Sequence, residues 1–479
     1  MTAPVVDTAV GSAGVVLCVD YGSTFTKVVL IDLARSRIVA ATSHRTTIDT
    51  DLIDGFDACR ARLAEIDPAA ATAPAYAASS AGGGLRILVV GNERLVTAEA
   101  GHRVALGSGG KVVGVIAAAE GLAFAAQIAE AEPDLILLVG GTDGGNPAPL
   151  VAAAEEIGRS GWHGPVVVAG NLEAQPKAVA ALGSRPVVTV ANVMPQIGVL
   201  EPGPARAAVR ACFLDHVIGG KQLSNDPRFT AMLLGATPDV VLRGMELLAA
   251  DSAVAGDLLL VDVGGATTDV YSVVEVDPED AGLSREVVAT TPLNRTVEAD
   301  LGMRWSAVET VAAGIEHGWG TDADLPAAAL RRGTPSWLPT TAEDQQLEER
   351  LASTAIHVAV RRHTGGSARS RRDPHRPDQS ATGPQHGPDL RSVAWVIGSG
   401  GVLRTLAAGS EPVAGQVIAA ALVAPASARL PEQPQVVVDR ELSITAAGLL
   451  LDAYPATAAR LARGLLESAS SRTFDGGIG

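Results

Sequence analysis

The chain has 479 residues and a formal net charge of −16, and hydrophobic residues make up 47% of it while aromatic residues make up only 3%. This length exceeds what one hydrophobic core usually organises, so we predict two or three domains with cores of Ala, Val, Leu and Ile. A surface with this net charge repels phosphate backbones and anionic lipids, which argues against nucleic acid and membrane partners.

Cysteine usage and hydropathy predict the location of the protein. Cys18, Cys59 and Cys212 are odd in number and form no CxxC pair, which argues against a disulfide framework and against a zinc site. The first residues lack the basic and apolar regions of a signal peptide, and no window holds the roughly 18 apolar residues of a membrane span. We therefore predict a soluble, cytoplasmic protein.

The first predicted elements are two strands in the stretch LCVDYGSTFTKVVLI (residues 17–31), followed by a third strand from Arg37 to Thr42. A phosphate chain with Mg²⁺ requires close backbone N–H groups, hydroxyl or lysine donors, and carboxylates that hold the metal's water molecules. The first turn offers all of these, and the alternative is an ordinary polar hairpin. The predicted contacts are Gly22 for backbone approach, Ser23, Thr24 and Thr26 as donors, Lys27 for outer phosphate oxygens, and Asp20 for the hydrated metal.

Between residues 85 and 191, apolar runs alternate with alanine-rich amphipathic stretches, a pattern typical of a parallel α/β sheet. Polar residues follow several runs, at the edge where open α/β sheets bind ligands. Asp143, Asn146, Asn171 and Asn192 therefore form either a second polar pocket or ordinary strand-ending turns.

A second strand pair is predicted after Gly256, around the stretch DVGGATTDV, about 240 residues after the first. It repeats the combination of aspartate, glycine and hydroxyl residues found in the first turn. Its predicted contacts are Asp262 at a strand end, Gly264 and Gly265 in the turn, Thr267 and Thr268 as donors, and then Asp269.

The stretch LNRTVEADLGMR follows, and we predict a helix from about Thr296 to Gly314. Its charged residues either line a ligand cleft or, for the two acidic ones, simply favour the first turn of a helix. These residues are Arg295, Glu298, Asp300 and Arg304.

Residues 364–391 are rich in Arg, Pro, Gly and Ser and almost without apolar residues, so burial cannot offset the entropy of ordering them. We predict a mobile loop there. The following stretch WVIGSGGVLRTL predicts a strand, a glycine turn and a helix N-terminus, an arrangement suited to adenosine and α-phosphate contact. Gly398, Gly400 and Gly401 are its predicted contact residues.

In order and spacing, these three turns resemble the phosphate 1, phosphate 2 and adenosine motifs of the superfamily of actin, sugar kinases and heat-shock chaperone ATPases. The resemblance implies an α/β fold of two ribonuclease-H-like ATPase domains, with an inserted parallel, Rossmann-like α/β subdomain at about 85–215. It also implies MgATP between the domains, with Asp20 and Asp262 arranging Mg²⁺ through water, Lys27 holding phosphate and Asp269 positioning the attacking water. The histidines lack metal-ligand spacing, so we predict no other metal.

Three further segments, ANVMPQIGVLEPGPARAAV (191–209), LNRTVEADLGMR (293–304) and DRELSITAAGLL (439–450), resemble the glutamate mutase accessory proteins of the GlmL or MutL type. With the three turns, the resemblance covers nearly the whole chain. It departs at Ala191, where the family carries an acidic residue. The resemblance implies an ATP-dependent reactivating chaperone, with slow ATP hydrolysis, for an adenosylcobalamin-dependent mutase. Cobalamin is expected on that partner, because the chain has no DxHxxG cobalamin signature.

The predicted division places a first ATPase domain at residues 14–256, a second at 257–455, and a C-terminal helix and tail at 456–479. Two alternatives on the same fold remain open. A small-molecule kinase would need a carboxylate base that faces a substrate hydroxyl, and an actin-like filament protein would polymerise with ATP. The sequence does not predict an oligomeric state.

Overall fold

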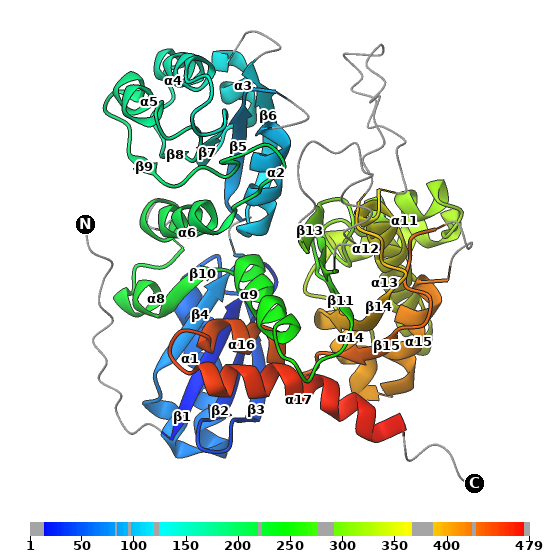
Figure 1. Ribbon diagram of the computed structural model, residues 1–479. Coiled ribbons are helices and arrows are strands. Elements are labelled where there is room, and N and C mark those ends of the chain that lie inside the picture. Colours follow the sequence, from blue (N-terminus) through cyan, green and yellow to red (C-terminus); the bar gives the residue numbers. More distant parts are fainter. Residues whose placement is uncertain are drawn as a thin grey trace.

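The computed structural model describes residues 14–81, 84–93, 97–118, 124–218, 223–275, 292–365, 387–409, 411–423 and 428–473. The fold is α/β, and the described residues contain three five-stranded sheets, two mixed and one parallel (Figure 1). Most of the loop predicted at 364–391 lies outside the described residues. Within the part of the chain that is described, no helix has both the length and the apolar character needed to cross a membrane.

The first sheet has the strand order β10-β4-β1-β2-β3. β1, β2 and β3 form an antiparallel meander, while β4 and β10 continue the sheet in parallel with β1. The three strands predicted at the start of the chain are confirmed. The bounds are β1 (Val15–Tyr21), β2 (Phe25–Asp32), β3 (Arg37–Arg45), β4 (Ala75–Ser79) and β10 (Leu233–Ala236), and helix α1 (Leu52–Ile66) packs on this sheet.

The second sheet repeats this topology with the order β13-β12-β11-β14-β15. Again three strands form an antiparallel meander and two more continue it in parallel. Its strands are β11 (Asp257–Val263), β12 (Thr268–Val273), β13 (Leu293–Glu298), β14 (Val393–Ser399) and β15 (Gln435–Val438). Its helices are α11 (Ala307–Glu316), α12 (Leu325–Gly333), α13 (Ala342–His363), α14 (Gly401–Gly409) and α15 (Glu411–Ala421).

The helix predicted from about Thr296 to Gly314 is wrong in its first half. Residues Leu293–Glu298 are strand β13, paired antiparallel with β12, and α11 begins only at Ala307. The β-branched Thr296 and Val297 suit a pleated edge strand. The acidic residues that suggested a helix start instead form ion pairs with Arg362 on α13.

The third sheet lies between β4 and β10 in the chain and is parallel throughout, as the alternating pattern predicted; we call residues 85–212 the insert. Its order is β6-β5-β7-β8-β9, and in Figure 1 it lies above the first sheet. Its strands are β5 (Arg86–Gly91), β6 (Lys111–Ala117), β7 (Leu135–Leu138), β8 (Val166–Val168) and β9 (Val187–Thr189). Its helices are α2 (Thr97–Gly107), α3 (Phe124–Ala131), α4 (Ala148–Arg159), α5 (Gln175–Leu182) and α6 (Gly203–Cys212), and the short helix α8 (Pro227–Met232) follows.

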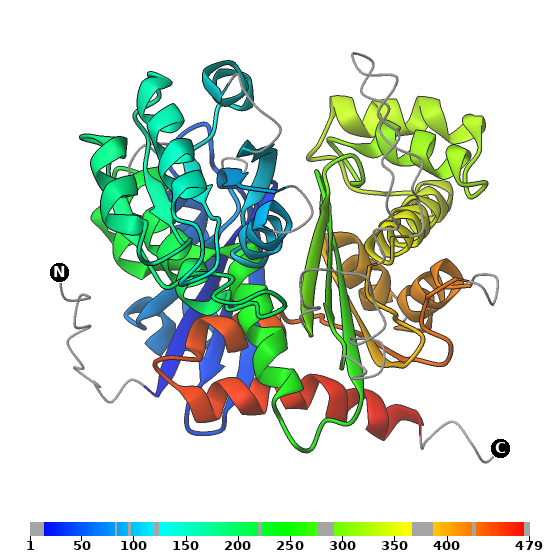
Figure 2. The ribbon, with the colours of Figure 1, turned by 45° about the horizontal axis from the view of Figure 1, so that its top comes forward.

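Equivalent helices follow the last strands of the two mixed sheets and pack on each other: α9 (Thr237–Ala249) and α16 (Ser443–Leu450). Two glycines permit a very close crossing. A Cβ on Gly244 would lie 2.2 Å from the Ile444 carbonyl oxygen, and a Cβ on Gly448 would lie 2.0 Å from that of Val240. Helix α17 (Pro455–Thr473) contacts α9, β3 and β15, so it runs beneath both mixed sheets (Figure 2).

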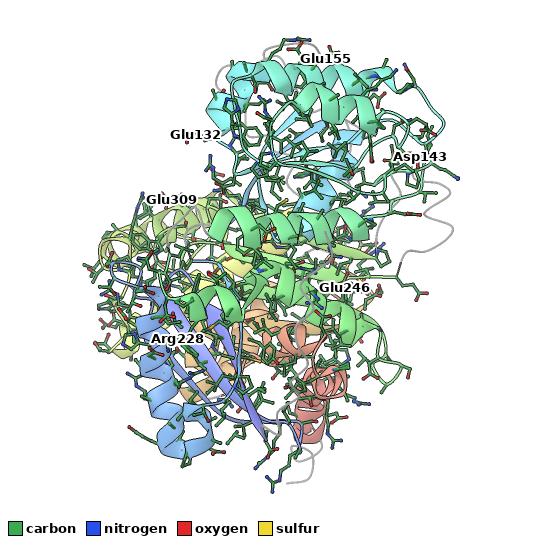
Figure 3. The ribbon with its side chains drawn as sticks, turned by 90° about the vertical axis from the view of Figure 1, so that its left-hand side faces the viewer. Glu132, Asp143, Glu155, Arg228, Glu246 and Glu309 are labelled. Atoms are coloured by element: carbon green, nitrogen blue, oxygen red, sulfur yellow. The ribbon has the colours of Figure 1, made fainter. Side chains whose placement is uncertain are left out.

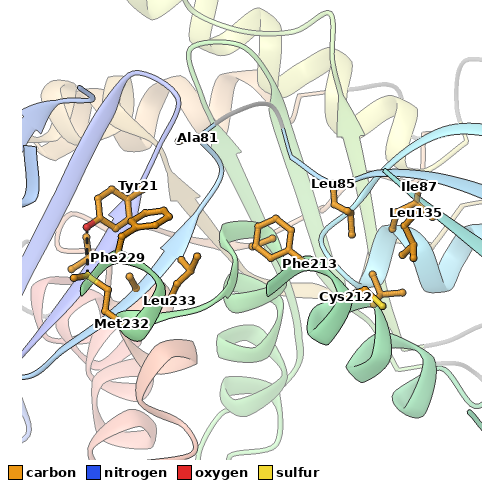
Figure 4. Packing of buried hydrophobic residues seen from close by; sticks show 14 of the residues in the cluster. Tyr21, Ala81, Leu85, Ile87, Leu135, Cys212, Phe213, Phe229, Met232 and Leu233 are labelled. Atoms are coloured by element: carbon orange, nitrogen blue, oxygen red, sulfur yellow. Dashed lines mark hydrogen bonds between the residues drawn. The ribbon is translucent and has the colours of Figure 1, made fainter. Parts of the chain in front are cut away.

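The first sheet and the insert share one hydrophobic core. Figure 4 shows this core running from Tyr21 and Phe229 through Phe213 to Leu85 and its neighbours in the insert. The Tyr21 and Phe229 rings meet edge to face with centroids 5.1 Å apart. Shared burial of this kind fixes the insert firmly to the first sheet. The three cysteines are buried free thiols.

Candidate functional site

A cavity of about 910 Å³ lies between the two mixed sheets, with the α2–β6 turn of the insert at its edge. Its walls include the turns β1–β2, β11–β12 and β14–α14, which are the three turns singled out in the sequence. The predicted residues that line it are Asp20, Gly22, Ser23, Thr24, Lys27, Asp262, Gly264, Gly265, Thr267, Asp269, Gly400 and Gly401.

The first turn holds a partly buried ion pair. Asp20 and Lys27 are opposite each other in the β1–β2 register, and Lys27 Nζ lies 2.8 Å from Asp20 Oδ2. The other carboxylate oxygen accepts a hydrogen bond of 2.8 Å from Thr237 Oγ1 at the start of α9. Asp20 is only 4% exposed, so these two donors compensate the loss of water around its charge.

The backbone of the first turn is closed by Gly22, whose N–H donates to the Phe25 carbonyl at 3.1 Å. A Cβ on Gly22 would lie 2.8 Å from that same oxygen, so the turn requires glycine. Ser23 is exposed, and Thr24 Oγ1 is buried without a hydrogen-bond partner among the described residues. The turn therefore has a hydroxyl donor that no group in the described residues uses.

The second turn has the same hydrogen bond. Gly264 N donates to the Thr267 carbonyl at 2.9 Å, and a Cβ on Gly264 would lie 2.9 Å from this oxygen. The loop before α11 supports the turn from behind through backbone and hydroxyl donors. Met303 N donates to Gly264 O, Arg304 N and Trp305 N donate to Gly265 O, and Ser306 Oγ donates to Ala266 O.

Two carboxylates occupy the positions that Asp20 and Lys27 hold in the first turn. Asp262 and Asp269 are opposite each other in the β11–β12 register. Asp269 accepts from Arg295 at 2.5 Å and from Thr267 Oγ1 at 3.2 Å. Asp262 has no hydrogen-bond partner in the described part of the chain, and burial raises its pKa, although nearby Lys27 opposes the shift. Asp262 is therefore the open carboxylate of the cavity.

The first and second turns approach each other closely. A Cβ on Gly265 would lie 2.9 Å from Thr24 Oγ1. The absence of a side chain at residue 265 therefore lets the two turns face one another across the cavity.

The third turn completes the wall. Gly400 has φ of 110°, and a Cβ there would lie 2.1 Å from the Val263 carbonyl oxygen at the end of β11. Arg404, one turn into α14, lines the cavity, and its Nη1 is buried without a hydrogen-bond partner among the described residues. Sequence reasoning did not single out Arg404.

Three predicted contact residues do not line the cavity. Thr26 and Thr268 are fully buried, and their hydroxyls lie against Thr46 and the Leu301 carbonyl. Gly398 lies within β14, where a Cβ would meet Ile418 at 2.4 Å. These three residues support the strands behind the turns, and a direct phosphate contact does not fit their positions.

The charged residues around β13 divide into two pairs. Arg295 and Arg304 line the cavity, whereas Glu298 and Asp300 accept hydrogen bonds of 2.8 Å from Arg362. Sequence reasoning missed two other residues of the wall, Thr237 and Ser79. Thr237 follows a short apolar run and precedes proline, which is a helix-start signal that marks its position.

The polar residues at the edge of the insert bond to one another and to the nearby backbone. Asn192 Nδ2 donates to Gly141 O and Asp143 Oδ1, both at 2.9 Å, and Asn171 Nδ2 donates to Thr142 O. Asn146 Oδ1 accepts from Ala148 N at the start of α4. Of the two interpretations, strand-ending turns fit these contacts, and Figure 3 shows Asp143 at the outer edge of the insert.

The duplicated topology and the polar cavity define an α/β protein with a charged cleft between two related sheets. The model of the MutL protein family matches residues 16–466, so the chain belongs to this family. It is 32% identical to protein MutL of Clostridium tetanomorphum over 460 residues, which cover 93% of this chain and 97% of that protein.

Solved structures give more distant similarities. One is nucleotide-free acetone carboxylase, with 13% identity, a TM-score of 0.39, and coverage of 91% of this chain and 70% of that chain. Another is the activator of 2-hydroxyisocaproyl-CoA dehydratase from Clostridium difficile with bound ADPNP. It has 10% identity, a TM-score of 0.30, and coverage of 92% of this chain and 95% of that chain.

Proposed function

We propose that the chain binds MgATP in the cavity between the mixed sheets and acts as an ATP-dependent accessory protein of an adenosylcobalamin-dependent mutase. The observation that carries the nucleotide site is the pair of matching glycine turns, which face each other across the cavity. Between them lies Thr24 Oγ1, which has no hydrogen-bond partner in the part of the chain that the structure describes. We further propose that the two mixed sheets form ribonuclease-H-like ATPase domains, at residues 14–256 and 257–455, with 456–479 as C-terminal helix and tail.

The donor set of the cavity fits a nucleotide. Backbone N–H groups in two turns, the Thr24 hydroxyl, Lys27 and Arg404 supply donors for phosphate oxygens, and the third turn suits adenosine. Mg²⁺ usually keeps several water molecules and uses one or two carboxylates together with phosphate oxygens. No group of three or more His, Cys, Asp or Glu side chains in the described residues could hold a metal by itself. We therefore assign Mg²⁺ to Asp20 and Asp262, acting through water and together with the phosphate oxygens of the nucleotide.

The residues of the chain have separate tasks in this proposal. Lys27, held by Asp20, neutralises outer phosphate oxygens, and bound Mg²⁺ would polarise these oxygens and offset their charge. Asp262 holds a water molecule, because its carboxylate is free of protein hydrogen bonds in the described residues. Asp269 is bonded to Arg295 and Thr267. It holds these two side chains in place and so helps to position the attacking water indirectly.

The accessory role rests on membership of the MutL protein family. The γ-phosphate is transferred to water, so the reaction is ATP hydrolysis. The ATP-bound and ADP-bound states differ in their affinity for the mutase. A ligand shifts a conformational equilibrium only by binding one state better than the other. Cobalamin belongs to the mutase subunit, and the pair works in the cytoplasm.

Isothermal titration calorimetry tests the nucleotide site directly. We expect the wild type to bind MgATP, Asp262→Ala to lose affinity by at least about tenfold, which is about 1.4 kcal/mol, and Asp54→Ala to bind like the wild type. Asp54 is a matched control because it is an exposed aspartate on α1, away from the cavity. Absence of binding by folded wild type would contradict the proposal.

The accessory role needs a separate assay. A cognate mutase inactivated by turnover is mixed with this protein and fresh adenosylcobalamin, in the presence of ATP, ADP or no nucleotide. We expect recovery of mutase activity with ATP alone, and its loss with Asp262→Ala but not with Asp54→Ala. Recovery that is indifferent to nucleotide would contradict the role, and rapid phosphorylation of a metabolite would favour the kinase alternative.

A further inference from the structure

A single buried side chain joins the second turn to the insert. Arg295 on β13 donates to Asp269 Oδ1 through Nη2 at 2.5 Å and through Nε at 3.1 Å. Its Nη1 donates at 2.9 Å to the carbonyl of Leu106, in the last turn of α2, and at 3.2 Å to the carbonyl of Gly110, in the α2–β6 turn. The side chain is only 3% exposed. One guanidinium therefore holds both a carboxylate of the cavity and the backbone of the insert.

The same turn of the insert also touches the helix that bonds to the first turn. A Cβ on Gly109 would lie 2.7 Å from the Asp239 N atom on α9, two residues after Thr237, which donates to Asp20. Asp239 itself is held by Arg210 of α6, with Nη2 3.0 Å from Oδ1. The α2–β6 turn therefore contacts α9, whose Thr237 bonds to Asp20, and also contacts Arg295, which bonds to Asp269.

We propose that Arg295 is a positioning residue that couples the second turn of the cavity to the α2–β6 turn of the insert. The inference rests on the proposed function, since it takes a nucleotide as the ligand. A polyanion in the cavity attracts Arg295, which lines the wall, and repels Asp269. Because the same guanidinium holds the two carbonyls, any change in its pairing with Asp269 alters the α2–β6 turn.

The packing around Arg295 leaves room for this change. A void of about 40 Å³ lies beside it, lined by residues of α2, α9 and β13. Well-packed interiors contain few voids larger than a water molecule, so the side chain can shift without forcing α2 apart from β13. The conformation of the α2–β6 turn therefore depends on how Arg295 pairs with Asp269 in the second turn.

Hydrogen exchange with mass spectrometry on the full chain tests the coupling at residues 104–112, with and without MgATP. In the wild type we expect exchange there to change by about fivefold or more on nucleotide binding, the lower end of couplings between sites. Arg295→Lys keeps the charge against Asp269 but has no planar fork to reach the carbonyls as well. At MgATP concentrations that saturate this variant in calorimetry, we expect it to lose the exchange change at residues 104–112.

The matched control is Arg206→Gln, which removes other ion pairs between the insert and α9, to Glu246 at 2.7 Å and to Asp239 at 4.0 Å. It should keep the nucleotide-dependent change. An unaltered change in Arg295→Lys overturns the coupling while nucleotide binding stands. Calorimetry on the same samples separates the two proposals, because a wild type that binds no nucleotide overturns both. Circular dichroism confirms that each variant is folded.

Discussion

The first and second turns share one backbone design and differ in charge. Each turn follows a buried strand, closes with a glycine N–H bound to the carbonyl three residues later, and allows no Cβ at that glycine. At the matching register positions, however, the first turn has Asp20 opposite Lys27, and the second has Asp262 opposite Asp269. In the first turn the two opposed residues form an ion pair with each other. In the second turn both opposed residues are carboxylates, and one of them, Asp269, pairs with Arg295 of β13.

This difference separates what the repeated fold supplies from what each copy adds. The backbone of both turns brings N–H groups toward the cavity, which suits any phosphate chain. The side chains then make the copies unequal, because the first turn offers a cation and the second an open carboxylate. A cleft between such unequal turns distinguishes the two ends of a ligand. If this description is right, the two turns should respond alike to backbone changes and differently to changes of charge.

The largest effect on stability should come from the ion pair of the first turn. Lys27→Met leaves Asp20 buried with only Thr237 as a side-chain donor. We expect the free energy of unfolding to fall by about 2–3 kcal/mol, somewhat below the usual loss for a broken buried pair because Lys27 is 22% exposed. Urea denaturation measures it. A loss below about 0.5 kcal/mol, the size of an ordinary surface substitution, would show that the pair is not structural.

The shared backbone design predicts equal losses at the two glycines. Gly22→Ala and Gly264→Ala place a Cβ 2.8 Å and 2.9 Å from a carbonyl oxygen. Since the clashes match, each variant should lose about 1–3 kcal/mol of unfolding free energy, and the two losses should agree within about 0.5 kcal/mol. Gly203→Ala, with no heavy atom within 4 Å of the Cβ, is the control. Losses that differ widely would break the equivalence of the turns.

We expect the free energy of unfolding to depend on pH through a histidine that is buried behind the second sheet. His363 is fully buried, bonded to Ser272 of β12 and Thr296 of β13, and burial lowers its pKa to about 3. Below an ordinary pKa of 6.5 the unfolded chain binds a proton that the folded chain does not, so stability falls as pH falls. Relative to His363→Asn, the wild type should lose about 1.4 kcal/mol between pH 7.5 and pH 5.5.

Thermal unfolding of both proteins at the two pH values measures this difference. His44→Asn is the control, because His44 is only partly buried and lies on β3 of the first sheet rather than behind the second. A pH dependence that is the same in the wild type and His363→Asn would mean that the buried imidazole already accepts a proton.

The smallest effect, and the one of opposite sign, belongs to Asp262. Because its carboxylate lacks a hydrogen-bond partner in the described residues and burial disfavours its charge, Asp262→Asn should raise the free energy of unfolding by up to about 1 kcal/mol. The same variant should weaken MgATP binding in calorimetry. A destabilised Asp262→Asn would indicate that the second turn, like the first, uses its carboxylate for folding.

Much of the fold and the site could be predicted because the turns carry local signals. Glycines and hydroxyl residues between apolar runs marked all three turns, and the alternation over residues 85–191 marked the parallel sheet. The misplaced residues follow from strand geometry. Side chains alternate between faces, so the neighbours of Lys27 and Asp269, namely Thr26 and Thr268, point away from the cavity. Applying that alternation to the sequence would have removed both.

Other residues could not be found because their roles depend on distant segments. Arg295 lies on an edge strand, and its carbonyl partners are about 190 positions earlier in the chain. The acidic residues after it indicated a helix start, whereas their partner is Arg362, more than 60 positions later. Local propensity carries no information about such pairings. Arg404 was missed for a simpler reason, because the glycines before it carried the recognisable pattern.

The crossing of α9 and α16 has a consequence for the order in which the protein is made. The crossing is so close that Gly244 and Gly448 leave no room for side chains between the two backbones. The residues of the first sheet and α9 leave the ribosome long before α16 does. Until then, the apolar surface of α9 that α16 covers, including Val240, lacks the helix that buries it. The N-terminal part of a nascent chain is therefore incomplete while it waits for the last helices, and a chaperone that binds exposed apolar helix would act in that interval.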